Sequence, residues 1–188
     1  MSSSAETKES LERAALHLFL RNGVDGTSMR DLVKQAGFSL GAFYNHFENK
    51  EELVWTLFSE TWYAMGVEMR RRTRAETDFH SQLRAVTDYM FELYDHDPDL
   101  IGYAFLTRHR YIMRVNVRLP NPHLVVRVFI ATAISRGAAQ KMDAEVATQF
   151  VMGTVIQMID ARLLGLLKGS LKSRSKEVAD TLYRALKK

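Results

Sequence analysis

The sequence contains no cysteine, and only three prolines interrupt its 188 residues. Without cysteine the chain has no disulfide framework, no thiolate metal site and no cysteine nucleophile. The scarcity of proline leaves long stretches free to form uninterrupted helices. These absences fit a protein of a reducing compartment.

Long apolar runs are also missing. The N-terminal segment lacks the basic stretch and apolar run of a signal peptide. No uncharged apolar stretch reaches the ~18 residues that a membrane span requires. We therefore expect a cytoplasmic protein that does not enter a membrane.

Motifs that would identify an enzyme are absent as well. There is no P-loop, no dinucleotide-binding glycine pattern after a strand, no His-Glu-x-x-His and no nucleophile elbow. A divalent metal could be held by Asp95, His96, Asp97 and Asp99, but these residues surround Asp97-Pro98 and fit an acidic loop between helices better. We expect no catalytic site, no metal site and no cofactor.

Apolar residues recur at helical spacing along nearly the whole chain, without strand-like alternation bounded by hairpin turns. The sequence therefore predicts an all-α protein of about nine helices. A long helix begins near Lys50 and ends in Arg70-Arg-Arg-Thr-Arg74, where arginines complement the dipole of a solvated helix end. The other helices are expected at residues 4–21, 28–36, 39–47, 80–96, 99–116, 122–136, 143–168 and 175–187.

The two short helices at 28–36 and 39–47 carry the strongest functional signal. Ser28 and Ser39 are placed to cap them, and Gly37 to end the first. Phe43 and Phe47 lie one turn apart and give the second helix an apolar edge. Its opposite edge is small and polar, so it fits the major groove of DNA, whose width admits one helix.

This segment resembles the tri-helical DNA-binding domain of the TetR (tetracycline repressor) family of bacterial regulators. The resemblance implies a homodimeric repressor that binds a palindromic operator of double-stranded DNA and leaves it when a small apolar or aromatic molecule binds the C-terminal domain. A helical protein-interaction adaptor without sequence-specific DNA binding is the alternative. The resemblance runs from Thr7 to Leu53 through Ala14-Ala15-Leu-x-Leu-Phe19, Gly23, Thr27-Ser28-Met29-Arg30-Asp31-Leu32, Ala36-Gly37-Phe38-Ser39, Gly41, Phe43-Tyr44-x-His46-Phe47 and Lys50-Glu51-Glu52-Leu53.

The resemblance implies DNA contacts for nine residues at helix starts and on the exposed edge of the second short helix. A phenol, an imidazole and free amides at helix N-termini can all donate to phosphate oxygens. Where this chain has Leu40, family members often have Lys or Arg, so the preferred operator is expected to differ. The nine residues are Ser28, Arg30, Ser39, Leu40, Gly41, Ala42, Tyr44, His46 and Lys50.

The formal net charge of +4 is not concentrated in this segment. Residues 1–76 contain 10 Lys and Arg against 11 Asp and Glu, whereas residues 77–188 contain 16 against 11. DNA binding must therefore depend on a few well-placed donors rather than on a broad positive field.

The C-terminal part is expected to hold the small molecule between facing helices, where methionine and aromatic side chains are frequent. For any single one of them a core role is the simpler explanation. Arg110, Arg114 and Arg118 fall at four-residue spacing and could meet an anionic ligand, although a solvated helix face explains them more simply. The candidate ligand contacts are Met90, Tyr94, Tyr103, Phe105, His109, Phe129, Met152 and Met158.

Two domains are predicted, 1–53 for DNA binding and 54–188 for ligand binding and dimerisation, with the long helix from Lys50 as the lever between them. Apolar positions at three-four spacing on the last two helices favour a self-complementary interface of four helices, although a core within one subunit would use the same stripe. The predicted interface residues are Phe150, Val151, Thr154, Val155, Met158, Ile159, Arg162, Leu163, Val178, Leu182 and Leu186.

Overall fold

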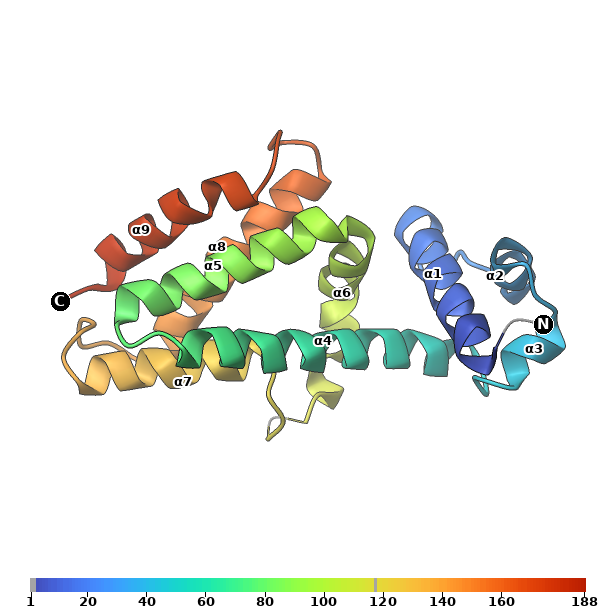
Figure 1. Ribbon diagram of the computed structural model, residues 1–188, viewed down its shortest axis with the longest axis horizontal. Helices are drawn as coiled ribbons and strands as arrows, with labels where there is room; N and C mark the ends of the chain where they lie inside the picture. Colours follow the sequence, from blue (N-terminus) through green and yellow to red (C-terminus); the bar gives the residue numbers. More distant parts are fainter. Residues whose placement is uncertain (1–2, 117) are drawn as a thin grey trace. The chain divides into compact units, whose positions relative to one another are not determined.

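The computed structural model describes residues 3–116 and 118–188, and within these residues the regular elements are helices. This confirms the predicted all-α class (Figure 1). In the described part of the chain, no helix is long and apolar enough to cross a membrane. The α-helices are α1 (Ser4–Asn22), α2 (Met29–Ala36), α3 (Leu40–Tyr44), α4 (Lys50–Arg74), α5 (Phe79–His96), α6 (Pro98–Tyr111), α7 (Pro122–Ser135), α8 (Ala144–Leu163) and α9 (Ser175–Leu186), with short 3-10 turns at Ile112–Arg114 and Lys172–Arg174.

The described residues form two compact units. The first contains residues 3–61 together with Gly102–Val115, and the second contains Trp62–Ile101 and Asn116–Lys188. Both α4 and α6 contribute residues to each unit. The expected domain boundary between residues 53 and 54 stays a prediction.

In the first unit, α1, α2 and α3 enclose an apolar centre (Figure 1). Leu11, Leu32 and Phe43 are each fully buried, and the rings of Phe43 and Phe47 lie 5.5 Å apart. Burial of such side chains is the main favourable term in folding, so this centre fixes the small helices to each other.

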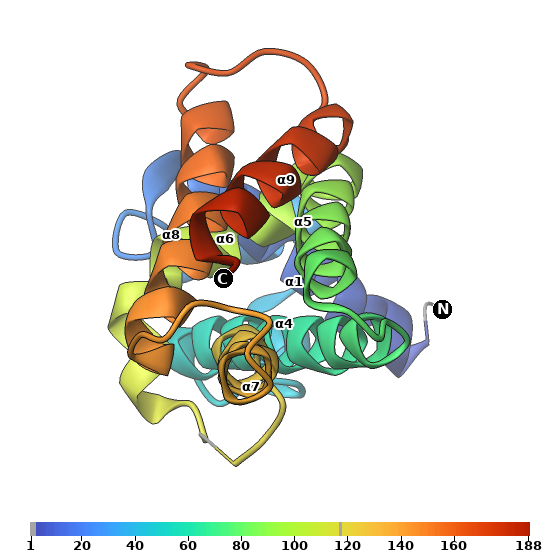
Figure 2. The ribbon, with the colours of Figure 1, turned by 90° about the vertical axis from the view of Figure 1, so that its left-hand side faces the viewer.

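The second unit is built on pairs of packed helices. Figure 2 shows α9 beside α5, and α7 packs against α8. Gly66 in α4 meets the backbone of Asn121, where a β-carbon would stand only 2.3 Å from the Asn121 Cα. A glycine is therefore required for this close approach of α4 to the start of α7.

Polar contacts between segments distant in sequence fix the last helix in this unit. The Asp95 carboxylate accepts hydrogen bonds from the amides of Leu171 and Lys172, so this acidic residue caps a turn. The hydroxyl of Ser175 donates to Asp88 at 2.5 Å. These contacts join the second half of α5 to the start of α9.

Two of the helices after α4 end well before the residue that the sequence predicted. The helix expected at 99–116 stops at Tyr111, because Val115 is extended and the Asn116 amide donates to the Tyr63 hydroxyl at 2.8 Å. The helix expected at 143–168 stops at Leu163, because Gly165 takes a left-handed φ of 73°. A left-handed glycine directly after a helix ends that helix, whatever follows it.

Candidate DNA interface

The connection between α2 and α3 is a tight turn. Gly37 takes a left-handed φ of 76°, and its amide donates to the Lys34 carbonyl while the Phe38 amide donates to Val33 at 2.9 Å. The Ser39 hydroxyl then accepts from the Ala42 amide at 3.1 Å and starts α3. This geometry confirms the predicted pair of short helices, although α3 has only five residues where 39–47 was expected.

The face of α3 that points away from the core is formed by Ser39, Leu40, Gly41 and Tyr44. Leu40 is 41% exposed, and Ala42 is half-buried. A β-carbon at Gly41 would meet only the Ser39 hydroxyl, at 3.8 Å. Packing among the described residues therefore does not require glycine at this position.

Tyr44 and His46 lie beside the two buried phenylalanines. The Tyr44 ring makes an edge contact with Phe43 and remains 54% exposed. The half-buried His46 ring lies 6.4 Å from that of Phe47. The ring contacts thus hold the Tyr44 hydroxyl and the His46 imidazole in fixed positions, where they can donate to phosphate oxygens.

Ser28 and Arg30 mark the start of α2, where both are at or near the surface. The Ser28 hydroxyl accepts from the Asp31 amide and donates to the Asp31 carboxylate at 2.6 Å. It therefore serves as the predicted cap, and its hydrogen is engaged within the chain. The Arg30 side chain is exposed.

Lys50, the first residue of α4, has an internal role that the sequence did not indicate. Its Nζ donates to the carbonyl oxygens of Val24 and Thr27 at 2.8 and 2.9 Å. The lysine thus fastens α4 to the α1–α2 connection. An ammonium has three donors, so one remains for a phosphate.

A cluster at the end of α6 was also missed. Arg110 pairs with Glu51 at 3.0 Å and with Asp25 at 3.4 Å. Arg114 pairs with the same Glu51 at 3.5 Å, and its guanidinium lies 4.4 Å from the centre of the Trp55 ring. The spacing of the arginines was visible in the sequence, but their acidic partners lie 59 to 85 residues away.

These features can be compared with known proteins. Residues 12–55 match the model of a family described as bacterial regulatory proteins, tetR family. Residues 12–55 thus match the DNA-binding segment of the tetR family. This match supports a DNA-binding transcriptional regulator over a protein-interaction adaptor.

Several transcriptional regulators are similar to this chain. The helix-turn-helix regulator YerO of Bacillus subtilis is 34% identical over 73 residues, which are 39% of this chain and only 24% of YerO. The fatty acid metabolism regulator protein of Bacillus subtilis is 23% identical over 178 residues, 92% of each chain. The crystal structure of FadR from Bacillus subtilis in complex with stearoyl-CoA shares the fold, with a TM-score of 0.75 and 20% identity over 93% of this chain and 97% of that one.

The candidate ligand contacts are divided between the two units. Tyr103, Phe105 and His109 belong to the first unit, and Tyr103 has a core role there. Its ring stacks on Phe19 and its hydroxyl donates to the Val54 carbonyl at 2.8 Å, while burial raises the pKa of the phenol. His109 is exposed. The candidates in the second unit are Met90, Tyr94, Phe129, Met152 and Met158.

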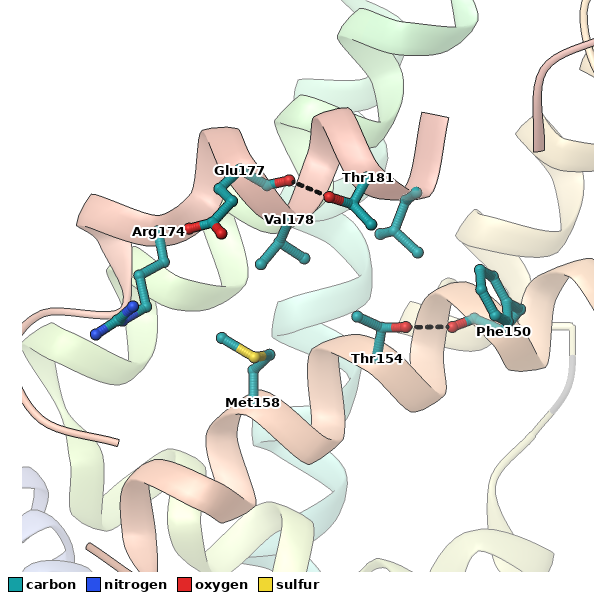
Figure 3. Close-up of a pocket in the computed structure, with 8 residues that line it drawn as sticks. Phe150, Thr154, Met158, Arg174, Glu177, Val178 and Thr181 are labelled. Atoms are coloured by element: carbon teal, nitrogen blue, oxygen red, sulfur yellow. Dashed lines mark hydrogen bonds between the residues drawn. The ribbon is translucent and has the colours of Figure 1, made fainter. Parts of the chain in front are cut away.

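The predicted interface stripe on α8 and α9 is also divided. Five members are buried within the chain, as a core within one subunit requires. Others point outward and line a hollow of about 220 Å³ between α8 and α9 (Figure 3). The buried members are Val151, Val155, Ile159, Leu182 and Leu186, and Arg162 donates to the Gly169 carbonyl. The outward members are Phe150, Thr154, Met158 and Val178, with Leu163 half-buried.

Proposed function

We propose that this regulator is a homodimeric repressor that inserts α3 of each subunit into successive major grooves of a palindromic operator and is released by a small molecule. The α3 face carries the proposal. It combines a glycine with no internal reason, an exposed leucine and a 54% exposed tyrosine. Small residues let a helix approach base edges closely, and a leucine can meet a thymine methyl.

Selection of binding sites from random duplexes tests this function directly. We expect a palindrome whose half-sites are about one helical turn apart, because two copies of α3 read one face of the duplex. Tyr44→Phe keeps the ring on Phe43 and removes only the hydroxyl, so it should weaken binding to specific and random duplexes alike. Leu40→Ala should instead change the free-energy preference for one base over another by ~1–3 kcal/mol.

A matched control is Leu106→Ala, because Leu106 is an exposed leucine on α6 of the first unit but lies outside α3. Titration at ~150 mM salt keeps surface contacts realistically screened. If Leu40→Ala and Leu106→Ala bind every duplex as the parent does, α3 does not read DNA. Enrichment of no duplex at all would contradict the function itself.

The outward residues of α8 and α9 support the dimer. Phe150 is 49% exposed, and Met158 and Val178 point toward each other across the hollow (Figure 3). Two copies of such a surface are self-complementary under two-fold symmetry. We expect Phe150→Asp to convert the dimer to a monomer and to weaken the operator complex, whereas Val146→Asp, on the same helix and 58% exposed, should not. If light scattering shows the parent protein to be a monomer at micromolar concentration, the proposed dimer is refuted.

Helix α6 is a route by which the ligand can act on DNA binding. Its start belongs to the second unit and its end to the first, where Arg110 and Arg114 pair with Glu51 near the start of α4. We expect Arg110→Gln to reduce the effect of the ligand on operator affinity, since coupling is typically ~1–3 kcal/mol. An unchanged ligand effect in operator titrations would exclude this route.

A further inference from the structure

A groove of about 300 Å³ lies in the second unit, between the end of α4, the start of α5 and the outer face of α7. Arginines stand around it, and apolar side chains from α7 form its floor. The residues that matter are Arg70, Arg74, Arg118, Leu124, Val128 and Phe129. The function proposed above does not use them.

The three arginines differ from their neighbours. Arg71 and Arg72 both bind the Glu68 carboxylate, at 2.6 and 2.8 Å, and these hydrogen bonds lower the pKa of Glu68 to about 2. Among the described residues, no carboxylate lies within ion-pair distance of Arg70, Arg74 or Arg118. The sequence run Arg70–Arg74 therefore divides into a paired face and an unpaired one.

Arg70 and Arg74 lie one turn apart on the same face of α4. Like charges at this spacing repel by a few tenths of a kcal/mol, although the negative end of the helix dipole offsets part of this. Arg118 brings a third positive charge from the segment before α7. Guanidinium groups of this kind bind carboxylates and phosphates through paired hydrogen bonds.

The floor is apolar and partly open. Val128 is 55% exposed, Leu124 is half-buried and Phe129 is buried. A single exposed valine is ordinary, but Val128 lies on the floor of the groove beside three arginines without a carboxylate partner. The contact between Gly66 and Asn121 holds α4 against the start of α7 and so fixes the width of the groove.

We propose that the effector of this regulator is an anionic amphiphile bound in this groove, with its apolar body on Leu124, Val128 and Phe129 and its carboxylate or phosphate head between the arginines. This inference rests on the proposed function, because it names the chemical class of the effector. The charges favour an anionic effector, because a neutral or cationic one would gain no charge-assisted hydrogen bonds from the arginines.

Calorimetric titration of the full-length protein tests the chemistry. The probes are decyl phosphate, decanoate, decanol, decyltrimethylammonium and inorganic phosphate, each below its aggregation threshold. Charge-assisted hydrogen bonds are worth ~1.5–3 kcal/mol, so the two anionic amphiphiles should bind at least about tenfold more tightly than decanol. The cation and inorganic phosphate should not bind measurably. Equal affinities for decanol and decyl phosphate, or for inorganic and decyl phosphate, would overturn the proposal.

Variants locate the binding. The pair Arg70→Gln and Arg74→Gln should reduce decyl phosphate affinity at least about tenfold. The control pair Arg71→Gln and Lys141→Gln removes the same charge elsewhere and should leave the affinity unchanged. For the floor, Val128→Asp should abolish binding of decanoate, whereas Val146→Asp, at a similarly exposed valine of α8, should not. Equal losses in both pairs would mean a nonspecific charge effect and would contradict this site.

Operator titrations separate this inference from the proposed function. Decyl phosphate should weaken the operator complex of the parent but not that of the Arg70→Gln and Arg74→Gln pair, which should still bind the operator when no ligand is present. Tight decyl phosphate binding without any change in operator affinity would overturn the groove as the effector site while DNA binding stands. A parent that binds no duplex would refute the proposed function, and calorimetry would still report on the groove.

Discussion

The DNA-binding helices and the C-terminal unit are stabilised by contacts of different range. In the first unit, Ser3, Ser28 and Ser39 each cap a helix through an amide three residues ahead. In the second, Asp95 reaches 77 residues to the Lys172 amide and Asp88 reaches 87 residues to Ser175. Local caps can be recognised in a sequence, whereas distant partners appear only when the helices pack.

The proposed DNA-contacting face of α3 and the arginine-lined groove also differ in what surrounds them. The α3 face is exposed, and its glycine has free space around it. The groove depends on a glycine with no free space, because Gly66 contacts the Asn121 backbone. Substitutions of the two glycines should therefore have opposite effects on stability. Four experiments, two of them at these glycines, test the differences between the two units in order of expected effect.

The largest effect is expected from Phe43→Ala. This fully buried side chain lies at the centre of the first unit, and removal of such a ring costs about 3–5 kcal/mol. We expect helical content and operator binding to be lost together in denaturant titrations. Tyr44→Ala, at the adjacent exposed position, should lose operator affinity with little change in stability. Similar unfolding curves for the two variants would show that Phe43 is not the structural centre.

Gly66→Ala is next. The added β-carbon would overlap the Asn121 backbone, so α4 and α7 must move apart at a cost of about 1–3 kcal/mol. Thermal unfolding should show the loss, and affinity for decyl phosphate should fall because the groove widens. A variant as stable as the parent would mean that the contact at Asn121 is not tight in solution.

Gly41→Ala should have the opposite sign. Alanine favours helix by up to about 1 kcal/mol over glycine, and the site has room for a β-carbon. The variant should therefore be at least as stable as the parent but bind its operator more weakly, because the helix sits further from the bases. Stronger or unchanged operator binding in an anisotropy titration would contradict the assigned face.

The smallest effect concerns pH. Burial raises the pKa of Asp88, but hydrogen bonds from Ser175, Lys172 and Arg84 outweigh it and leave the pKa below its usual value. A lowered pKa in the folded state stabilises the protein above the unfolded-state value of about 3.9, and this contribution disappears as the pH falls below it. The free energy of unfolding of Asp88→Asn should thus differ most from that of the parent at neutral pH, and the two should converge as the pH falls through the lowered pKa of Asp88. A constant difference would assign another role to Asp88.

Much of the first unit could be predicted from the sequence. Helical spacing gave the all-α class, Ser28 and Gly37 marked both ends of α2 within one residue, and Ser39 marked the start of α3. These signals are local, because a cap or a left-handed glycine acts within one turn of the helix it ends. The end of α8 was predicted at the later Gly169 because a local signal of the same kind stands at both glycines. Both take a left-handed φ, and the earlier one, Gly165, ends the helix.

Other features were decided by tertiary structure. The sequence predicted Lys50 as a DNA contact at the start of the long helix, but packing brought its ammonium to the carbonyls of Val24 and Thr27. It could not say that Tyr103 would lie on Phe19, or that Val151 would be buried while Phe150 would be exposed. The pairing of Arg71 and Arg72 with Glu68 is local to α4, whereas the groove beside Arg70 and Arg74 forms only where α7 lies. Side-chain pairing across distant segments is set by the packing of whole helices, and that information is not carried by any local stretch of the sequence.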